Sequence, residues 1–80
     1  MDWISGKRFL VTGGCGSIGA QLVYDLLDYG GQAIVIDNDE AMLHNLKKDI
    51  QSSNLEVQLG NIRSRDRMAE LVSNVDTVVH

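Results

Sequence analysis

The chain has 80 residues, a formal net charge of −4 and a single cysteine, Cys15. This length allows at most one small domain, and one cysteine excludes a disulfide within the chain. The acidic balance argues against binding to nucleic acid, which needs a basic face. The densest basic cluster, Arg63, Arg65 and Arg67, is interpreted as a solvated helix start.

No apolar run approaches the roughly 20 residues of a membrane-spanning helix, and the N-terminus lacks the apolar region of a signal peptide, so we expect a cytoplasmic protein.

The first half of the chain predicts two buried strands separated by a helix. Residues 8–11 are a short apolar run that stops at Gly13, which is typical of a strand buried on both faces. Residues 17–29 have apolar side chains at helical spacing, which predicts a helix, and two glycines at positions 30–31 end it. The apolar positions of this helix are Ile18, Leu22, Val23, Leu26 and Leu27. Residues 32–36 predict a second buried strand.

The second half repeats this alternation. Residues 37–40 are Asp, Asn, Asp and Glu; they suit the start of a helix because their oxygens accept hydrogen bonds from unpaired backbone amides. Residues 55–59 alternate apolar and polar, which predicts a strand near the sheet edge, and residues 75–80 predict a fourth strand. Between these two strands, residues 64–73 predict a third helix with Ser64 as its N-cap. The apolar faces of the second and third helices are Met42, Leu43, Leu46 and Ile50, then Met68, Leu71 and Val72.

The order of these elements indicates the topology. Strands that alternate with helices of this length pair in parallel through right-handed crossovers. We therefore predict an α/β fold with a Rossmann-like parallel sheet, β-α-β-α-β-α-β in the strand order 3-2-1-4, within one domain over residues 1–80. The fourth strand is then an apolar parallel edge, which favours pairing with another chain. We expect self-association through this edge, as a two-fold dimer.

A glycine-rich turn, TGGCGSIG, joins the first strand to the first helix and holds four of the eight glycines. Gly14, Gly16 and Gly19 match G-x-G-x-x-G, and Gly13, Gly16 and Gly19 match the related G-x-x-G-x-x-G. In such a turn the first glycines permit the sharp bend. The middle glycine lets a pyrophosphate approach the backbone, and the last lets the helix pack closely on the sheet. The helix N-terminus beyond it is a site for an anion.

An acidic residue, Asp37, ends the second predicted strand, 18 positions after Gly19. A carboxylate there accepts hydrogen bonds from both hydroxyls of an adenosine ribose and repels a 2′-phosphate, which predicts NAD in preference to NADP. Two alternatives remain open. The glycines can form a structural turn without a ligand, and Asp37 can be the N-cap of the second helix. Both roles of Asp37 are compatible if Asn38 supplies the cap.

Four segments, VTGGCGSIG, VIDNDE, LGNIR and VDTVVH, together resemble the N-terminal part of the extended short-chain dehydrogenases/reductases. Within that group the chain is most similar to nucleotide-sugar epimerases and dehydratases, especially the sugar 4,6-dehydratases of polysaccharide biosynthesis. The resemblance extends from about Lys7 to His80. It implies that the pyrophosphate of NAD is held by Gly13, Gly16, Ser17, Ile18 and Gly19.

The resemblance also implies an adenosine site. The residue that matches Asp37 holds the ribose, and Asn38 assists. The family has Gly-Asp-Ile or a similar segment after the third strand, where the Asp accepts from the adenine amine and the next backbone N–H binds a ring nitrogen. Here Asn61 replaces that Asp and Ile62 follows it. The amide oxygen of Asn61 can still accept from the amine; alternatively, Asn61 is only a turn residue.

The Tyr-x-x-x-Lys pair that is catalytic in the family lies beyond His80. Neither Tyr24 nor Tyr29 has a lysine four positions later, and the two histidines, His44 and His80, have no metal-like spacing. We therefore expect no catalytic residue and no metal ligand in this chain. Cys15 is interpreted as a small residue that fits the turn.

These observations lead to two hypotheses for function. In the first, the chain is the NAD-binding portion of a nucleotide-sugar dehydratase or epimerase, an enzyme with oxidoreductase and lyase chemistry whose sugar substrate binds only the full-length protein. It is then inactive alone. In the second, the chain is a stand-alone, non-catalytic nucleotide-binding module.

Overall fold

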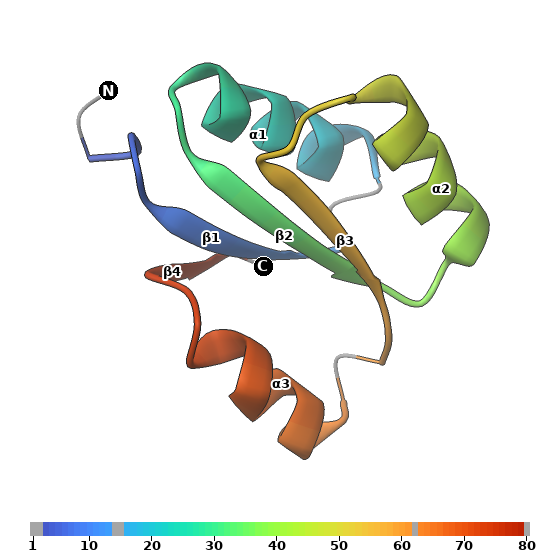
Figure 1. Cartoon of the computed structure of the whole chain (residues 1–80). Helices are drawn as coiled ribbons and strands as arrows, with labels where there is room; N and C mark the ends of the chain where they lie inside the picture. The colour runs from blue at the N-terminus through green and yellow to red at the C-terminus, as the bar shows by residue number, and fades with distance from the viewer. Residues whose placement is uncertain (1–2, 14–15, 62, 80) are drawn as a thin grey trace.

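Strands and helices alternate throughout the computed structural model, which describes residues 3–13, 16–61 and 63–79 (Figure 1). In chain order the elements are β1 (Arg8–Thr12), α1 (Ser17–Asp28), β2 (Gln32–Asp37), α2 (Glu40–Asp49), β3 (Leu55–Leu59), α3 (Arg65–Val72) and β4 (Thr77–Val79). The sheet order is β3-β2-β1-β4, and every neighbouring pair is parallel. The predicted α/β fold and the strand order 3-2-1-4 are therefore confirmed.

The two faces of the sheet are covered unequally. Helices α1 and α2 lie on one face, and α3 alone lies on the other (Figure 1). Side chains alternate between the two faces along each strand, so Phe9 and Val11 pack with α1 and α2, whereas Leu10 belongs to the cluster on the α3 side. The face of α1 and α2 holds the larger buried cluster, and no residue of α3 is fully buried.

Three apolar residues lie outside the core, contrary to the sequence-based expectation. Ile18 is 87% exposed because it occupies the first turn of α1, whereas Val23 and Leu26, further along, make the contact with the sheet. Met42 is 42% exposed. It immediately precedes the buried Leu43, and one residue along a helix rotates a side chain by about 100°. Val72 is 42% exposed at the last position of α3.

The last strand is shorter than the predicted 75–80. The side chain of Asp76 accepts a hydrogen bond from the backbone N–H of Arg8 at 2.8 Å, and its own N–H donates to the Arg8 carbonyl at 2.8 Å. Pairing in the sheet begins one residue later, at Thr77. Val75 instead packs against the apolar cluster on the α3 side of the sheet. His80 lies outside the described residues.

Candidate functional site

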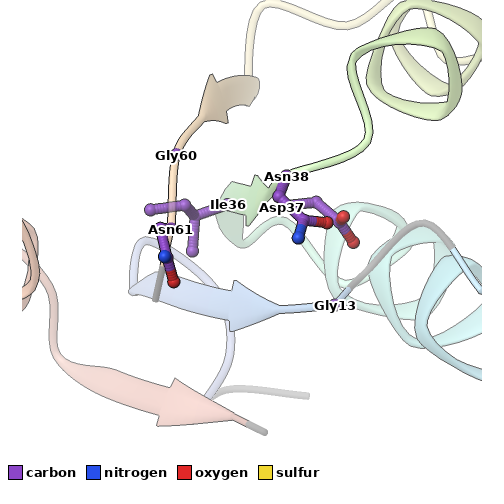
Figure 2. Close-up of a pocket in the computed structure, with 6 residues that line it drawn as sticks. All are labelled: Gly13, Ile36, Asp37, Asn38, Gly60 and Asn61. Atoms are coloured by element: carbon purple, nitrogen blue, oxygen red, sulfur yellow. The ribbon is translucent and has the colours of Figure 1, made fainter. Parts of the chain in front are cut away.

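A pocket of about 210 Å³ opens at the carboxyl ends of the three strands β1, β2 and β3 (Figure 2). This is the edge at which parallel α/β sheets bind ligands. The pocket is lined by Gly13, Ile36, Asp37, Asn38, Gly60 and Asn61. Four of these six residues, Gly13, Asp37, Asn38 and Asn61, are ones that the sequence predicts to bind a cofactor, and the fold brings them together from three separate turns.

Gly13 and Gly16, the two described glycines of the first turn, differ in backbone conformation. Gly13 has φ of +69°, a left-handed conformation that residues with a side chain rarely adopt, and its N–H donates to the Ile36 carbonyl at 3.2 Å. Gly16 has φ of −71° and ψ of 165°, which any residue adopts. A Cβ built on Gly16 meets no atom within 4 Å. Neither backbone conformation nor packing in the described protein therefore explains the glycine at position 16, and open space there suits the close approach of a ligand.

Helix α1 begins in a way that suits an anion. Gly16 is its N-cap and offers no capping side chain, and the first turn contains no acidic residue. Helix α2 differs, because the side chain of Asp39 accepts from the Met42 N–H at 3.1 Å and Glu40 lies in the first turn. The first amides of a helix have no partner within it, and the helix dipole is positive there. At α1 this positive end is not neutralised by a carboxylate of the first turn.

Of the other residues predicted for the pyrophosphate, Ile18 is exposed and Gly19 is half-buried, both in the first turn of α1. The close packing of Gly19 on the sheet stays a prediction. The backbone of Ser17 begins the helix, but its side chain lies outside the described part of the structure, as do Gly14 and Cys15.

Asp37 is the last residue of β2, and its side chain and carbonyl both accept hydrogen bonds from the backbone. Its Oδ1 accepts from the Asp39 N–H at 3.0 Å, and its carbonyl accepts from the Gly60 N–H at 3.0 Å. The N-cap of α2 is Asp39, so the alternative in which Asp37 caps this helix is wrong, and so is the idea that Asn38 supplies the cap. Asn38 is exposed and lines the pocket. The Oδ2 oxygen of Asp37 has no hydrogen bond among the described residues.

Asn61 forms a similar turn after β3. Its Oδ1 accepts from the Arg63 N–H at 2.9 Å, and its carbonyl accepts from the Ser64 N–H at 3.0 Å. The interpretation of Asn61 as a turn residue is therefore correct, and the residue also lines the pocket. Ile62, the other residue predicted to contact adenine, lies outside the described residues.

Arg67 lies beside Gly60, one of the residues that line the pocket. The sequence did not indicate this position. A Cβ on Gly60 would lie 2.7 Å from Arg67 Nε and 3.3 Å from Ile36 Cδ1, so only glycine fits there without displacing a neighbour. The guanidinium Nη2 donates to Gln58 Oε1 at 2.7 Å, and Nε is buried without a hydrogen-bond partner. The expectation that Arg67 is a solvated residue is wrong. Its contact depends on how α3 docks against the sheet, and a charged residue at a helix start does not reveal it.

The remaining candidates do not converge on the pocket. Tyr24 is exposed on α1 and Tyr29 is its exposed C-cap, and neither lines the pocket. Across residues 3–13, 16–61 and 63–79, no group of three or more His, Cys, Asp or Glu side chains is arranged to hold a metal ion. In the same described part, none of the helices has the length and apolar character needed to cross a membrane.

A parallel sheet in the order 3-2-1-4, with a glycine turn leading into a helix that has no capping side chain, defines a Rossmann-like α/β fold. The particular family follows from the sequence of the same segment. Residues 9–80 match the family described as polysaccharide biosynthesis protein, and the chain belongs to it.

Curated relatives agree with this family. The chain is 37% identical over 80 residues to an uncharacterized membrane protein of Methanocaldococcus jannaschii, covering 99% of this chain and 24% of that protein. It is 35% identical over 85 residues to a bifunctional UDP-glucose 4-epimerase and UDP-xylose 4-epimerase of Pisum sativum, covering 95% and 24%. It is 31% identical over 78 residues to an inverting UDP-N-acetylglucosamine 4,6-dehydratase of Campylobacter jejuni, covering 95% and 23%. The chain thus spans about a quarter of the length of these relatives.

Solved structures have the same fold. Pen from Bacillus thuringiensis superposes with a TM-score of 0.87 and 26% identity, over 95% of this chain and 24% of that one. A short-chain dehydrogenase from Leptospira borgpetersenii with bound NAD⁺ gives a TM-score of 0.67 and 28% identity, over 84% and 24%. The enzyme WbmG of Bordetella bronchiseptica in complex with NAD gives 0.69 and 25%, over 89% and 22%.

Proposed function

We propose that residues 1–80 form an NAD-binding half-domain that holds the adenosine and pyrophosphate of the cofactor within a nucleotide-sugar dehydratase or epimerase. The observation that carries this proposal is Gly16, a glycine that neither its φ of −71° nor any neighbouring atom requires. A ligand that approaches the backbone closely is a physical reason for its missing side chain. The presence of NAD in two similar solved structures supports the choice of cofactor.

The start of α1 and the residues of the pocket have separate roles in this proposal. The N-terminus of α1 carries free backbone donors and a positive dipole end, which stabilise the two negative charges of a pyrophosphate. Gly13 and Gly16 leave the approach to these donors clear. Asp37 accepts hydrogen bonds from the ribose hydroxyls through Oδ2, because its Oδ1 is engaged by the Asp39 N–H. Asn38, beside it, assists at the ribose, and Asn61 faces the base from across the pocket (Figure 2).

The charge of Asp37 accounts for the proposed preference for NAD over NADP. A 2′-phosphate on the ribose would lie next to this carboxylate, and two like charges at about 4 Å repel by roughly 1–4 kcal/mol, depending on solvent exposure. No basic residue lines the described pocket to offset this repulsion.

The chemistry of the whole enzyme is part of the same proposal. Bound NAD would supply the acceptor for a hydride from a hexose carbon and the donor from which that hydride returns. This chain contributes binding and orientation only, and it is inactive without the Tyr-x-x-x-Lys segment of a longer protein. A cytoplasmic location also belongs to the proposal, because one unpaired thiol suits a reducing compartment.

The test is calorimetric titration of the purified chain with NAD and, separately, with NADP. We expect saturable binding of NAD and at least about tenfold weaker binding of NADP. The reason is that a like-charge repulsion of roughly 1.4 kcal/mol or more lowers the affinity by a factor of ten or more. Binding of neither nucleotide by a folded chain would contradict the proposal. Turnover of a nucleotide sugar by residues 1–80 alone would contradict the proposal that this chain contributes binding and orientation only.

We also propose that the isolated chain self-associates through β4. This strand pairs with β1 on one side, lies at the end of the sheet order, and exposes 37% of Val78. An apolar parallel edge favours pairing with a second chain. Analytical sedimentation at high micromolar concentration should detect a dimer; a single monomeric species at that concentration would refute this proposal.

A further inference from the structure

Two strands end at the pocket with the same local structure. At the end of β2, Oδ1 of Asp37 accepts from the N–H of Asp39, two residues later, at 3.0 Å. Just after β3, Oδ1 of Asn61 accepts from the N–H of Arg63, also two residues later, at 2.9 Å. Figure 2 shows Asp37 and Asn61 on opposite sides of the pocket that both residues line.

The two side chains differ in what remains after this hydrogen bond. The carboxylate of Asp37 keeps a second oxygen, Oδ2, which is an acceptor. In the carboxamide of Asn61 the second terminal atom is Nδ2, which carries two donors and no acceptor. The orientation of the Asn61 amide follows from the hydrogen bond itself, because a backbone N–H can pair only with the oxygen. The pocket therefore has an acceptor on the Asp37 side and a donor on the Asn61 side.

The turn around Asn61 holds this arrangement. The Asn61 carbonyl accepts from the Ser64 N–H, and the preceding Gly60 is held by its N–H bond to the Asp37 carbonyl. Rotating the carboxamide to place its oxygen at the base would leave the Arg63 N–H without that partner, and losing a hydrogen bond is unfavourable.

We propose that Asn61 recognises the nucleobase as a hydrogen-bond donor through Nδ2, so that the site accepts hypoxanthine about as well as adenine. This inference rests on the proposed function, NAD binding in the same pocket. Adenine offers ring nitrogens as acceptors, and hypoxanthine offers ring nitrogens and its 6-oxo group. An aspartate at position 61 would instead leave a carboxylate oxygen facing the base. That oxygen pairs with the exocyclic amine of adenine and repels the 6-oxo group of hypoxanthine.

The experiment compares NAD with deamino-NAD, in which hypoxanthine replaces adenine. Both are titrated by calorimetry against the wild-type chain, Asn61→Asp, and the control Asn45→Asp, which makes the same chemical change at an exposed position of α2 outside this pocket. We expect the wild type to bind the two nucleotides within about threefold of each other. We expect Asn61→Asp to favour NAD by at least about tenfold, because a carboxylate oxygen that faces the 6-oxo group leaves both acceptors without a donor. The ratio for Asn45→Asp should equal that of the wild type.

A structural readout accompanies the affinities. Asp at position 61 keeps an oxygen for the Arg63 N–H, so the turn should persist, and circular dichroism together with the Arg63 amide signal in NMR establishes that each variant is folded. In the wild type, the side-chain NH₂ signal of Asn61 should shift when either nucleotide is added.

The outcomes separate the inference from the proposed function. If the wild type binds NAD but rejects deamino-NAD by tenfold or more, the oxygen of Asn61 serves the adenine amine and the inference is wrong. The same conclusion follows if Asn61→Asp leaves the ratio of the two affinities unchanged. If a folded wild-type chain binds neither nucleotide, the proposed function fails and the inference fails with it.

Discussion

Gly16→Ala distinguishes a glycine kept for a ligand from one kept for the fold. Two stability terms oppose each other at this N-cap. Alanine is a poorer N-cap than glycine by roughly 0.5–1 kcal/mol, but it reduces the freedom of the unfolded chain by about 0.4–1 kcal/mol where the native φ and ψ suit it. The φ of −71° and ψ of 165° suit alanine, and no atom lies within 4 Å of the added Cβ. The free energy of unfolding should therefore change by less than about 0.5 kcal/mol, the difference of these two terms.

The same substitution should weaken NAD binding clearly. The Cβ would occupy space through which the pyrophosphate reaches the first amides of α1. An added methyl group in a closely packed contact costs about 1–3 kcal/mol, which corresponds to a roughly five- to 150-fold loss of affinity.

Urea denaturation measures the first quantity and calorimetric titration with NAD measures the second. The reasoning would be refuted by unchanged NAD affinity, which would make Gly16 irrelevant to a ligand. It would also be refuted by a loss of stability above about 1.5 kcal/mol, well outside the two opposing terms, because Gly16 would then be structural.

Two further substitutions test the fold and the ribose site. Gly31→Ala places a Cβ 2.9 Å from Ile4 Cγ2 and 3.0 Å from the Leu26 carbonyl oxygen, and both residues belong to the core. We therefore expect urea denaturation to show a free energy of unfolding lower by about 1–3 kcal/mol. A variant as stable as the wild type would show that this contact relaxes freely. Asp37→Asn keeps an oxygen for the Asp39 N–H but removes the negative charge. In paired titrations, the affinity for NADP relative to that for NAD should therefore rise about tenfold. An unchanged ratio of the two affinities would exclude Asp37 as the residue that selects between the two nucleotides.

Much of the pocket was predictable because it depends on strand ends. The change from apolar runs to polar or glycine residues marks where each strand stops, and parallel strands place their carboxyl ends at one edge of the sheet. The turn at Gly13 and the position of Asp37 follow from this rule. Both line the pocket.

The exposure of individual side chains was less predictable. Periodicity places Ile18 and Met42 near the apolar stripes of their helices, but it does not say where along its length a helix meets the sheet. Among the described side chains of these two helices, only Val23, Leu26, Leu43 and Leu46 are buried, because the strands beneath them are just five or six residues long.

The sequence by itself determined the alternation of strands and helices, the parallel topology and the family, because these depend on the period of apolar residues and on a local glycine motif. The tertiary structure decided the hydrogen-bonding character of the pocket. Whether Asn61 offers its oxygen or its nitrogen depends on which atom the following backbone engages, and the need for glycine at position 60 depends on where Arg67 docks. These features arise from contacts between atoms brought together by folding, and residue type and spacing alone do not specify them.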